Sequence, residues 1–227
     1  MKKFLMLFLT IALGFHGAQP AEQNDYSFKL LTGKELQDIA LFMIQQRIEI
    51  MRDYPYLYQG DMNEEIIYMQ QFISLPHAAA AVAYLHDQPV GFVSGTSFLD
   101  YESDMRGSSA LFMEHGLDPK DFYYIPEAMI MAEHRRKSLF KSLHHLIELH
   151  AQSLGYKALC LLSENHDQHP LKPIDYRGPD GAFTRAGYSK TDMIMVISPD
   201  VFVWPTIQPD GSIKIQTHFL AYWIKIF

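Results

Sequence analysis

The chain has 227 residues but a single cysteine, Cys160, which excludes an internal disulfide bond and any metal site made of four cysteines. Positive charge is also scarce, because 19 lysines and arginines stand against 26 aspartates and glutamates, giving a formal net charge of −7. This balance does not predict general binding to nucleic acid. Any site for an anion must therefore be local, made by a few basic residues that lie together.

Several other signatures are missing. No repeat, low-complexity tract or Pro-rich or Gly/Ser-rich linker divides the chain after residue 24, so we expect one domain over residues 25–227. No Gly-x-Ser-x-Gly motif is present, which excludes the nucleophile elbow of an α/β-hydrolase. His166, Asp167 and His169 have ligand-like chemistry, but they stand in a proline-containing loop that does not align them. We therefore predict no metal site.

The amino terminus reads MKKFLMLFLTIALGFHGAQPAEQ, with Lys2 and Lys3 before an apolar run over residues 4–15 and small residues near Ala18 and Ala21. This layout is typical of a secretory signal peptide, and the run is too short for a transmembrane helix. We expect residues 1–24 to be a leader that exports the protein or anchors it in a membrane. One alternative is an anchor that is not cleaved. Another is a misassigned start codon, in which case the protein would be cytoplasmic.

Hydrophobic periodicity predicts alternating strands and helices, an α/β class with parallel pairing in the middle of the chain. Thr32 and Glu35 match a capping box at the start of the first helix. The expected strands cover residues 26–31, 79–85, 90–98, 122–131, 157–163, 191–198 and 221–227, with a turn over residues 86–89. The expected helices cover residues 32–51, 63–74 and 139–154, with short segments within 101–121 and 180–188.

Residues 131–156 read MAEHRRKSLFKSLHHLIELHAQSLGY, so a strand end, a basic turn and an amphipathic helix ending at Gly155 follow one another. Arg135, Arg136 and Lys137 stand just before this helix. The first N–H groups of a helix lack partners within the helix and lie at the positive end of its dipole. A strand, a basic turn and a helix start therefore favour phosphate binding. If the turn is considered alone, the alternative to phosphate binding is that its basic side chains are simply solvated.

The order of elements and several motifs together resemble the GCN5-related N-acetyltransferase (GNAT) superfamily over roughly residues 26–227. Its acetyl-CoA turn reads Arg/Gln-x-x-Gly-x-Gly/Ala, and RRKSLF at residues 135–140 corresponds to it. LGYKALCLL and FTRAGY match elements that follow the turn in the family. RDYPYLYQGD, HPLKPIDYR and THFLAYWIK look like one bacterial subfamily of unassigned substrate.

The resemblance implies a mixed central β-sheet of six to seven strands flanked by helices on both faces. It also implies acetyl-CoA as cosubstrate and direct attack by a primary amine of a small molecule or protein, without an acyl-enzyme. Expected partners are acetyl-CoA and this amine, with no nucleic acid and no membrane beyond an N-terminal anchor. A homodimer stays open.

The expected cofactor contacts lie at the end of the long strand and in the basic turn. Backbone N–H groups of Met129 and Met131 are expected to hold the pantetheine and polarise the carbonyl. Three residues depart from the family pattern: Ser138 and Phe140 replace small residues, and Phe183 replaces a tyrosine. The full set of cofactor candidates is Met129, Ile130, Met131, Arg135, Arg136, Lys137, Ser138, Leu139 and Phe140.

Acetyl transfer needs a group that accepts the proton of the amine and one that protonates the thiolate. Glu127 is a carboxylate in an otherwise apolar strand, at a position where several GNAT proteins place a general base, and a paired structural carboxylate is the alternative. Tyr176 and Tyr188 are the candidates for the acid, while Cys160 is interpreted as a core residue rather than a nucleophile. The predicted function is acetyl-CoA-dependent N-acetylation. The alternative is a catalytically silent GNAT-fold module that binds a ligand or a partner.

Overall fold

The computed structural model describes residues 25–101, 107–164, 169–200 and 203–227. The predicted leader lies outside these ranges, as do His166 and Asp167. Within the described ranges, no helix is long and apolar enough to cross a membrane, and no cluster of three or more histidine, cysteine or acidic side chains is arranged to hold a metal ion.

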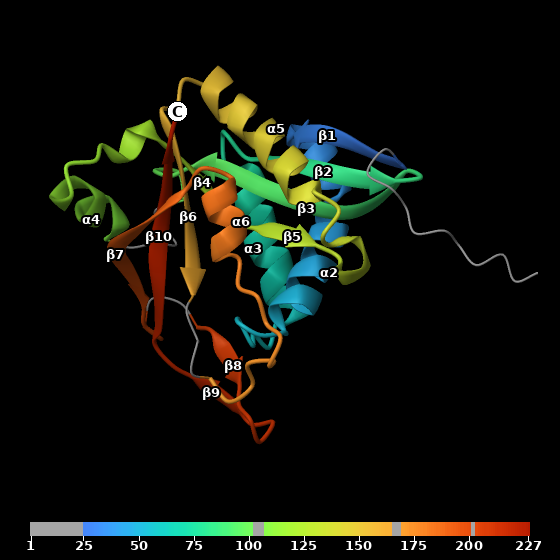
Figure 1. The fold of residues 1–227 in the computed structure, drawn as a ribbon, viewed down its shortest axis with the longest axis vertical. Helices are drawn as coiled ribbons and strands as arrows, with labels where there is room; N and C mark the ends of the chain where they lie inside the picture. Colours follow the sequence, from blue (N-terminus) through green and yellow to red (C-terminus); the bar gives the residue numbers. More distant parts are fainter. Residues whose placement is uncertain (1–24, 102–106, 165–168, 201–202) are drawn as a thin grey trace, which may run out of the picture.

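A mixed β-sheet forms the centre of the molecule (Figure 1). Seven strands follow one another across it in the order β1-β2-β3-β4-β6-β10-β7, and the short strand β5 pairs with β3 beside β4. The only parallel pair recorded among the described strands is β4 with β6. The predicted α/β class with a mixed sheet is therefore confirmed. The strands of this sheet are β1 (Tyr26–Thr32), β2 (Ala79–Leu85), β3 (Gln88–Ser97), β4 (Phe122–Ile125), β5 (Ala128–Ile130), β6 (Ala158–Glu164), β7 (Ser189–Ile197) and β10 (His218–Ile226).

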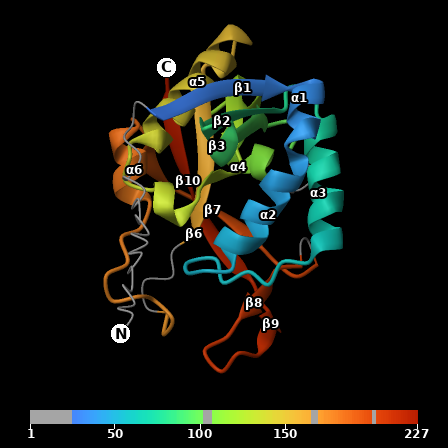
Figure 2. The ribbon, with the colours of Figure 1, turned by 90° about the vertical axis from the view of Figure 1, so that its right-hand side faces the viewer.

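Helices cover both faces of the sheet, as predicted (Figure 2). They are α1 (Gly33–Asp38), α2 (Ala40–Met51), α3 (Met62–Ser74), α4 (Ser108–Glu114), α5 (Leu139–Ser153) and α6 (Asp180–Arg185). The first predicted helix is divided at Ile39 into α1 and α2, and the Thr32 side chain makes no capping hydrogen bond, so the capping-box prediction is wrong. A short 3₁₀ turn, η3 (Pro119–Asp121), precedes β4, and another, η4 (Ala132–His134), follows β5.

Each face of the sheet carries its own core. Buried Leu139, Leu143 and Ile147 of α5 pack against alternate side chains of the strands on one face. On the other face α1, α2 and α3 pack over β1 to β3, and α4 packs near β7 and β10. Cys160 lies in the core beside α4, fully buried, which confirms its interpretation as a core residue.

Glycine at two positions of β3 lets neighbouring groups approach the strand closely. A Cβ on Gly95 would lie 2.3 Å from the Tyr123 ring, and one on Gly91 would lie 2.9 Å from the carbonyl oxygen of Met129. The second contact matters for function, because β3 holds β5 in place along one edge through this close pairing.

The predicted long strand over residues 122–131 is instead two strands, interrupted at Pro126 and Glu127. β4 pairs with both β3 and β6, whereas β5 pairs with β3 and has no recorded pairing with β6. Proline has no N–H to donate and is found at the ends of strands or at bulges. The sheet therefore divides after Ile125, and β5 and β6 diverge.

Candidate active site

The divergence of β5 from β6 opens a cleft with a volume of about 310 Å³. Ile125 and Ala128 line it on one side and Leu161 on the other. Arg135 of the basic turn and Tyr176 of the loop after β6 also face it. The basic turn and the strand edge thus meet at one cleft.

The direction of the β5 amides differs from the prediction. The N–H of Met131 donates to the carbonyl oxygen of Val90 at 3.1 Å, and the carbonyl oxygen of Glu127 accepts from the N–H of Ser94 at 3.0 Å. Because backbone groups alternate along a strand, Met129 shares this direction toward β3. The expectation that the N–H groups of Met129 and Met131 face the cofactor is therefore wrong. Alternation turns the backbone groups of Ala128 and Ile130 toward the cleft instead.

The basic turn has two residues with left-handed backbone, Arg136 at φ 61° and Ser138 at φ 60°. In a turn, left-handed residues can direct successive N–H groups to one side, as in the concave nests that bind anions. Ser138 precedes the first residue of α5, so the N–H groups of the first helical turn follow directly. Glycine would occupy this conformation without strain, which explains why the family motif has glycine where Ser138 stands.

The basic side chains of this turn have different surroundings. Arg135 lines the cleft, and its Nε donates to the carbonyl oxygen of Ile130 at 2.9 Å, which ties the turn to β5. Arg136 is exposed. The ammonium group of Lys137 lies 5.8 Å from the centre of the Tyr26 ring. Arg135 is therefore the one of the three that lines the cleft.

Leu139 and Phe140 have side chains that pack into the protein rather than into the cleft. Leu139 is 1% exposed and belongs to the core under α5. The Phe140 ring lies 5.5 Å from the His144 ring and 6.1 Å from the Phe183 ring. Only the backbone of these two residues can therefore meet a cofactor, and the phenylalanine at this position packs on α6.

A second cavity of about 170 Å³ adjoins the cleft and shares residues with it, among them Tyr56, Pro126 and Ala128. One end carries Arg47 and Glu127. The remainder of its wall is aromatic and apolar: Tyr58, Tyr124, Met195, Ile197, Trp204 and Leu220. Pro126 and Ala128 therefore lie between the cleft, which Arg135 lines, and the second cavity, which Glu127 lines.

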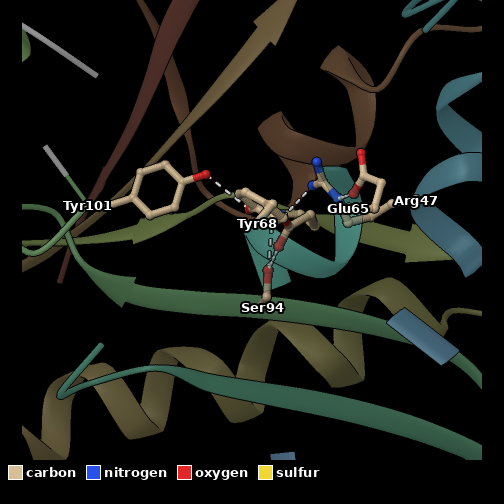
Figure 3. A network of polar contacts seen from close by, with 6 residues as sticks. Arg47, Glu65, Tyr68, Ser94 and Tyr101 are labelled. Atoms are coloured by element: carbon tan, nitrogen blue, oxygen red, sulfur yellow. Dashed lines mark hydrogen bonds and ion pairs between the residues drawn. The ribbon is translucent and has the colours of Figure 1, made fainter. Parts of the chain in front are cut away.

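Glu127 is 3% exposed and contacts several polar side chains. Figure 3 shows the network that these contacts belong to, with Arg47, Glu65, Tyr68, Ser94 and Tyr101 labelled. Glu127 Oε1 accepts from Arg47 Nη1 at 2.6 Å and from the Tyr68 hydroxyl, and Glu127 Oε2 accepts from the Ser94 hydroxyl. The Tyr101 hydroxyl donates to that of Tyr68 at 3.0 Å. Glu127 is therefore a paired carboxylate, which was the alternative interpretation of this residue. It also lines the second cavity.

Arg47 joins two carboxylates. Its Nε contacts Glu65 Oε2 at 2.5 Å, while its Nη1 contacts Glu127. Burial acts to lower the pKa of Arg47, but the surrounding Tyr68, Glu127 and Glu65 outweigh it and hold that pKa above its ordinary value. The guanidinium therefore stays charged, and one positive charge faces two buried carboxylates.

The two predicted acids have different positions. Tyr188 is 3% exposed, its hydroxyl lies 2.7 Å from His144 Nε2, and it belongs to the core under α5. It lines neither cavity, so its prediction as the catalytic acid is wrong; a tyrosine next to Gly187 in the sequence does not reveal on which side of the sheet its ring lies. Tyr176 does line the cleft, and its ring packs edge to face on Tyr54 at 4.5 Å.

Tyr56 is the candidate that the sequence analysis missed. It lines both cavities, and its ring stacks on Trp204 at 6.1 Å. Burial, followed by the effects of Tyr176 and Glu164, raises the pKa of Tyr56 to about 12. The phenol is therefore a proton donor throughout the neutral range. The signal in the sequence was the tyrosine-rich stretch RDYPYLYQGD.

The three stretches that suggested a subfamily meet at these cavities. Residues 52–61 contact residues 169–177 through Tyr54 and Tyr176, and Tyr58 forms an isolated bridge with Thr206 of β8 (Pro205–Ile207). β8 pairs with β9 (Ile213–Ile215), which leads into β10 and the third stretch. Residues distant in the sequence thus build one continuous wall.

With this geometry in view, the fold can be compared with solved structures. Ribosomal-protein-alanine N-acetyltransferase from Brucella melitensis superposes with a TM-score of 0.55 at 12% identity, covering 88% of this chain and 99% of that one. An N-acetyltransferase from Staphylococcus aureus Mu50 gives 0.53 at 13%, covering 88% and 98%. An acetyltransferase of the GNAT family from Streptococcus pneumoniae gives 0.52 at 14%, covering 89% and 99%.

These likenesses define the fold: the chain has the fold of the GNAT acetyltransferase superfamily, as its sequence predicted. At such low identity they say nothing about substrate, and they assign no subfamily. No protein-family model matches the chain, and no curated protein matches it. Its chemistry must therefore be argued from its own residues.

Proposed function

We propose that the protein is an acetyl-CoA-dependent N-acetyltransferase. The observation that carries this proposal is the junction of two spaces at Pro126–Ala128: a cleft that Arg135 of the basic turn lines on one side, and a cavity with the Glu127 carboxylate in its wall on the other. Transfer between two substrates requires both to be held with their reacting atoms adjacent. A module that binds one ligand has no need of the second space.

The residues around the cleft fit a CoA thioester. The nest at Arg136 and Ser138 and the start of α5 offer N–H groups to a pyrophosphate. Along β5, Ala128 and Ile130 turn their backbone groups to the open edge, where they can pair with an extended pantetheine arm and polarise a carbonyl. The cosubstrate supplies an activated acetyl group as a thioester.

The proton balance can be met by groups that line the cavities. The amine nitrogen forms a bond to the acetyl carbon while the carbon–sulfur bond breaks, so one proton leaves the amine and one is taken up by the sulfur. In this proposal Glu127 accepts the first, directly or through the hydroxyls of Tyr101 and Tyr68, which is supported by its position in the wall of the second cavity. Tyr56 or Tyr176, which line the cleft, donates the second.

Glu65 makes proton uptake by Glu127 electrostatically feasible. With Arg47 positive and both carboxylates ionised, the three groups carry a net charge of −1. One added proton brings the group to zero, whereas a simple ion pair would be left with a buried positive charge, which is costly. The second carboxylate therefore supports a basic role for the first.

One observation favours a second candidate, a silent binding module. Both carboxylate oxygens of Glu127 already accept hydrogen bonds from Arg47, Tyr68 and Ser94, and a fully paired carboxylate is a weaker base. Calorimetry with CoA and a thiol-release assay with acetyl-CoA and an amine panel separate the two. Binding of CoA with release of thiol on addition of an amine supports the enzyme. Binding without release by any amine would leave the silent module, and absence of CoA binding would overturn the acetyltransferase.

A further inference from the structure

The 170 Å³ cavity beyond Ala128 has a shape, a charge and a wall chemistry that together restrict what it can hold. We propose that its ligand is a small primary monoamine with a single apolar group, about one aromatic ring with a short alkyl arm. This rests on the proposed function, because it names the acceptor class of the same site. It narrows that class by excluding diamines, amino acids and protein amino groups.

The size of the cavity sets the first limit. An engineered protein cavity of about 150 Å³ lined by apolar side chains holds one benzene molecule. A volume of about 170 Å³ therefore accommodates one ring with a short arm. Three of the side chains that line it are buried: Met195 and Leu220 are each 5% exposed and Trp204 is 6% exposed. A peptide or a multi-ring sugar is larger than this volume.

Charge sets the second limit. Among the described residues that line the cavity, Arg47 and Glu127 are the charged ones, and both lie at one end. Arg47 is already shared between Glu65 and Glu127, so the three groups carry one excess negative charge there. An ammonium group is attracted to that end, whereas a carboxylate would be repelled by Glu127.

The opposite end is apolar, and this orients the ligand. Ile197, Trp204 and Leu220 line the cavity but not the cleft, and none of them carries a charge. A second ammonium group in this position would lose its hydration, and the carboxylate of Glu164, which lies beyond the Trp204 and His218 rings, already contacts His218 Nδ1 at 2.5 Å. The aromatic walls suit an apolar body instead, and Trp204 lies between Tyr56 and His218 as a stack of rings, with centroid distances of 6.1 Å and 4.5 Å. The amine end then lies beside Ala128, next to the cleft.

The test is calorimetric titration of the full chain without CoA, using five compounds in two series, one with a phenyl ring and one with a six-carbon chain. 2-Phenylethylamine is the expected ligand. 2-Phenylethanol removes the charge, phenylalanine adds a carboxylate, and 1,6-diaminohexane, compared with hexylamine, adds a second ammonium group. We expect each paired change to weaken binding by at least tenfold. Equal affinity for the amine and the alcohol, or for the amine and the amino acid, would overturn the proposal.

Filling the cavity provides the matched variants. Leu220→Phe and Ile197→Phe each add volume at the apolar end, and either should reduce 2-phenylethylamine binding at least tenfold while CoA affinity is unchanged. Two positions are used so that misfolding of one variant leaves the other as a test. Undiminished amine binding in a folded variant would place the amine elsewhere and overturn the proposal.

The result is distinguishable from a failure of the proposed function. Amine binding with the expected selectivity but no CoA binding would retain the monoamine site and remove the acetyltransferase. Conversely, CoA binding with thiol release only on addition of a peptide or a diamine would retain the acetyltransferase and overturn the monoamine proposal.

Discussion

Arg47 and Glu127 are 80 residues apart in the sequence, yet Arg47 Nη1 lies 2.6 Å from Glu127 Oε1 in the wall of the second cavity. The guanidinium carbon also lies 3.9 Å from the centre of the Tyr68 ring, and the Tyr68 hydroxyl donates to the same carboxylate. α2 and α3 are thereby joined to the segment between β4 and β5. A change in this contact is therefore expected to affect both the second cavity and the edge of the cleft.

Replacing Glu127 tests its role as a proton acceptor. Glu127→Gln retains size and most hydrogen bonds, so we expect a folded protein whose kcat is about 10²- to 10⁴-fold lower at neutral pH. The defect should diminish at high pH, where the amine is already deprotonated. The measurement is a pH profile of thiol release together with CoA affinity, which should be nearly unchanged.

The matched control is Glu65→Gln, because Glu65 contacts Arg47 but does not line the cavity. It removes the same charge from the network without removing the proposed acceptor, so kcat should fall less. Equal losses in the two variants would mean that the charge of the network, and not proton transfer to Glu127, limits the rate. If Glu127→Gln unfolds, the residue is primarily a structural partner.

The basic turn can be tested one arginine at a time. Arg135→Ala should weaken CoA binding by about 1–3 kcal/mol, because it removes a charged group from the cleft and its bond to Ile130. Arg136→Ala should have a smaller effect, and the double variant the largest. Lys214→Ala, which removes one exposed positive charge from β9, is the control. If CoA affinity is unchanged in the folded double variant, both arginines are solvated surface residues that do not bind CoA.

The left-handed backbone of Ser138 predicts an unusual gain of stability. At φ 60° a side chain is strained, whereas glycine is not, so Ser138→Gly should raise the free energy of unfolding by about 1 kcal/mol. Ser142→Gly, in the first turns of α5, should lower it by about 0.5 kcal/mol. Urea denaturation of both variants measures the difference. A loss of stability in Ser138→Gly would contradict the assigned backbone conformation.

Tyr56 and Tyr188 give opposite expectations for protonation of the thiolate. Tyr56→Phe removes a hydroxyl that faces both cavities and should lower kcat about 10- to 10²-fold with little change in CoA affinity. Tyr188→Phe removes a hydroxyl buried against His144 and should change stability rather than kcat. Steady-state kinetics of these two variants and of Tyr176→Phe identify the residue that donates the proton to the thiolate. A loss of kcat confined to Tyr188→Phe would reverse the assignment.

His144 predicts a dependence of stability on pH. Burial, followed by the effect of Lys225, lowers the pKa of His144 to about 4, below its ordinary value of about 6.5. The unfolded chain therefore binds this proton more readily, so the stabilising effect is complete above about pH 6.5 and is lost as the pH falls toward 4. The expected loss is about 3 kcal/mol, from the pKa difference.

Denaturant titrations between pH 4.5 and 7.5 measure this loss. His144→Gln can still bond to Tyr188 but does not titrate, so its stability should vary less with pH. His145→Gln changes an exposed neighbour on the same helix and should retain the dependence of the parent protein. Identical pH profiles for the parent and His144→Gln would exclude His144 as the source.

The positions of the helices and strands followed largely from the sequence, because hydrophobic periodicity and turn residues act over short distances. Alternation predicted the β2–β3 hairpin, helical spacing predicted the inner face of α5, and the basic residues before Leu139 predicted an anion site at its start. Glu127 was also evident from the sequence, since a carboxylate in an apolar strand requires a partner or a role.

Only the tertiary structure decided which partners Glu127 has and which amides face the cleft. Arg47, Tyr68 and Ser94 come from three different elements, and no local pattern links them to the segment between β4 and β5. The amide directions depend on strand register, because a shift of one residue reverses every N–H. Tyr188 and Tyr56 have the same side chain, yet packing places the first in the core and the second between both cavities. Long-range packing, which local sequence does not encode, determines these positions.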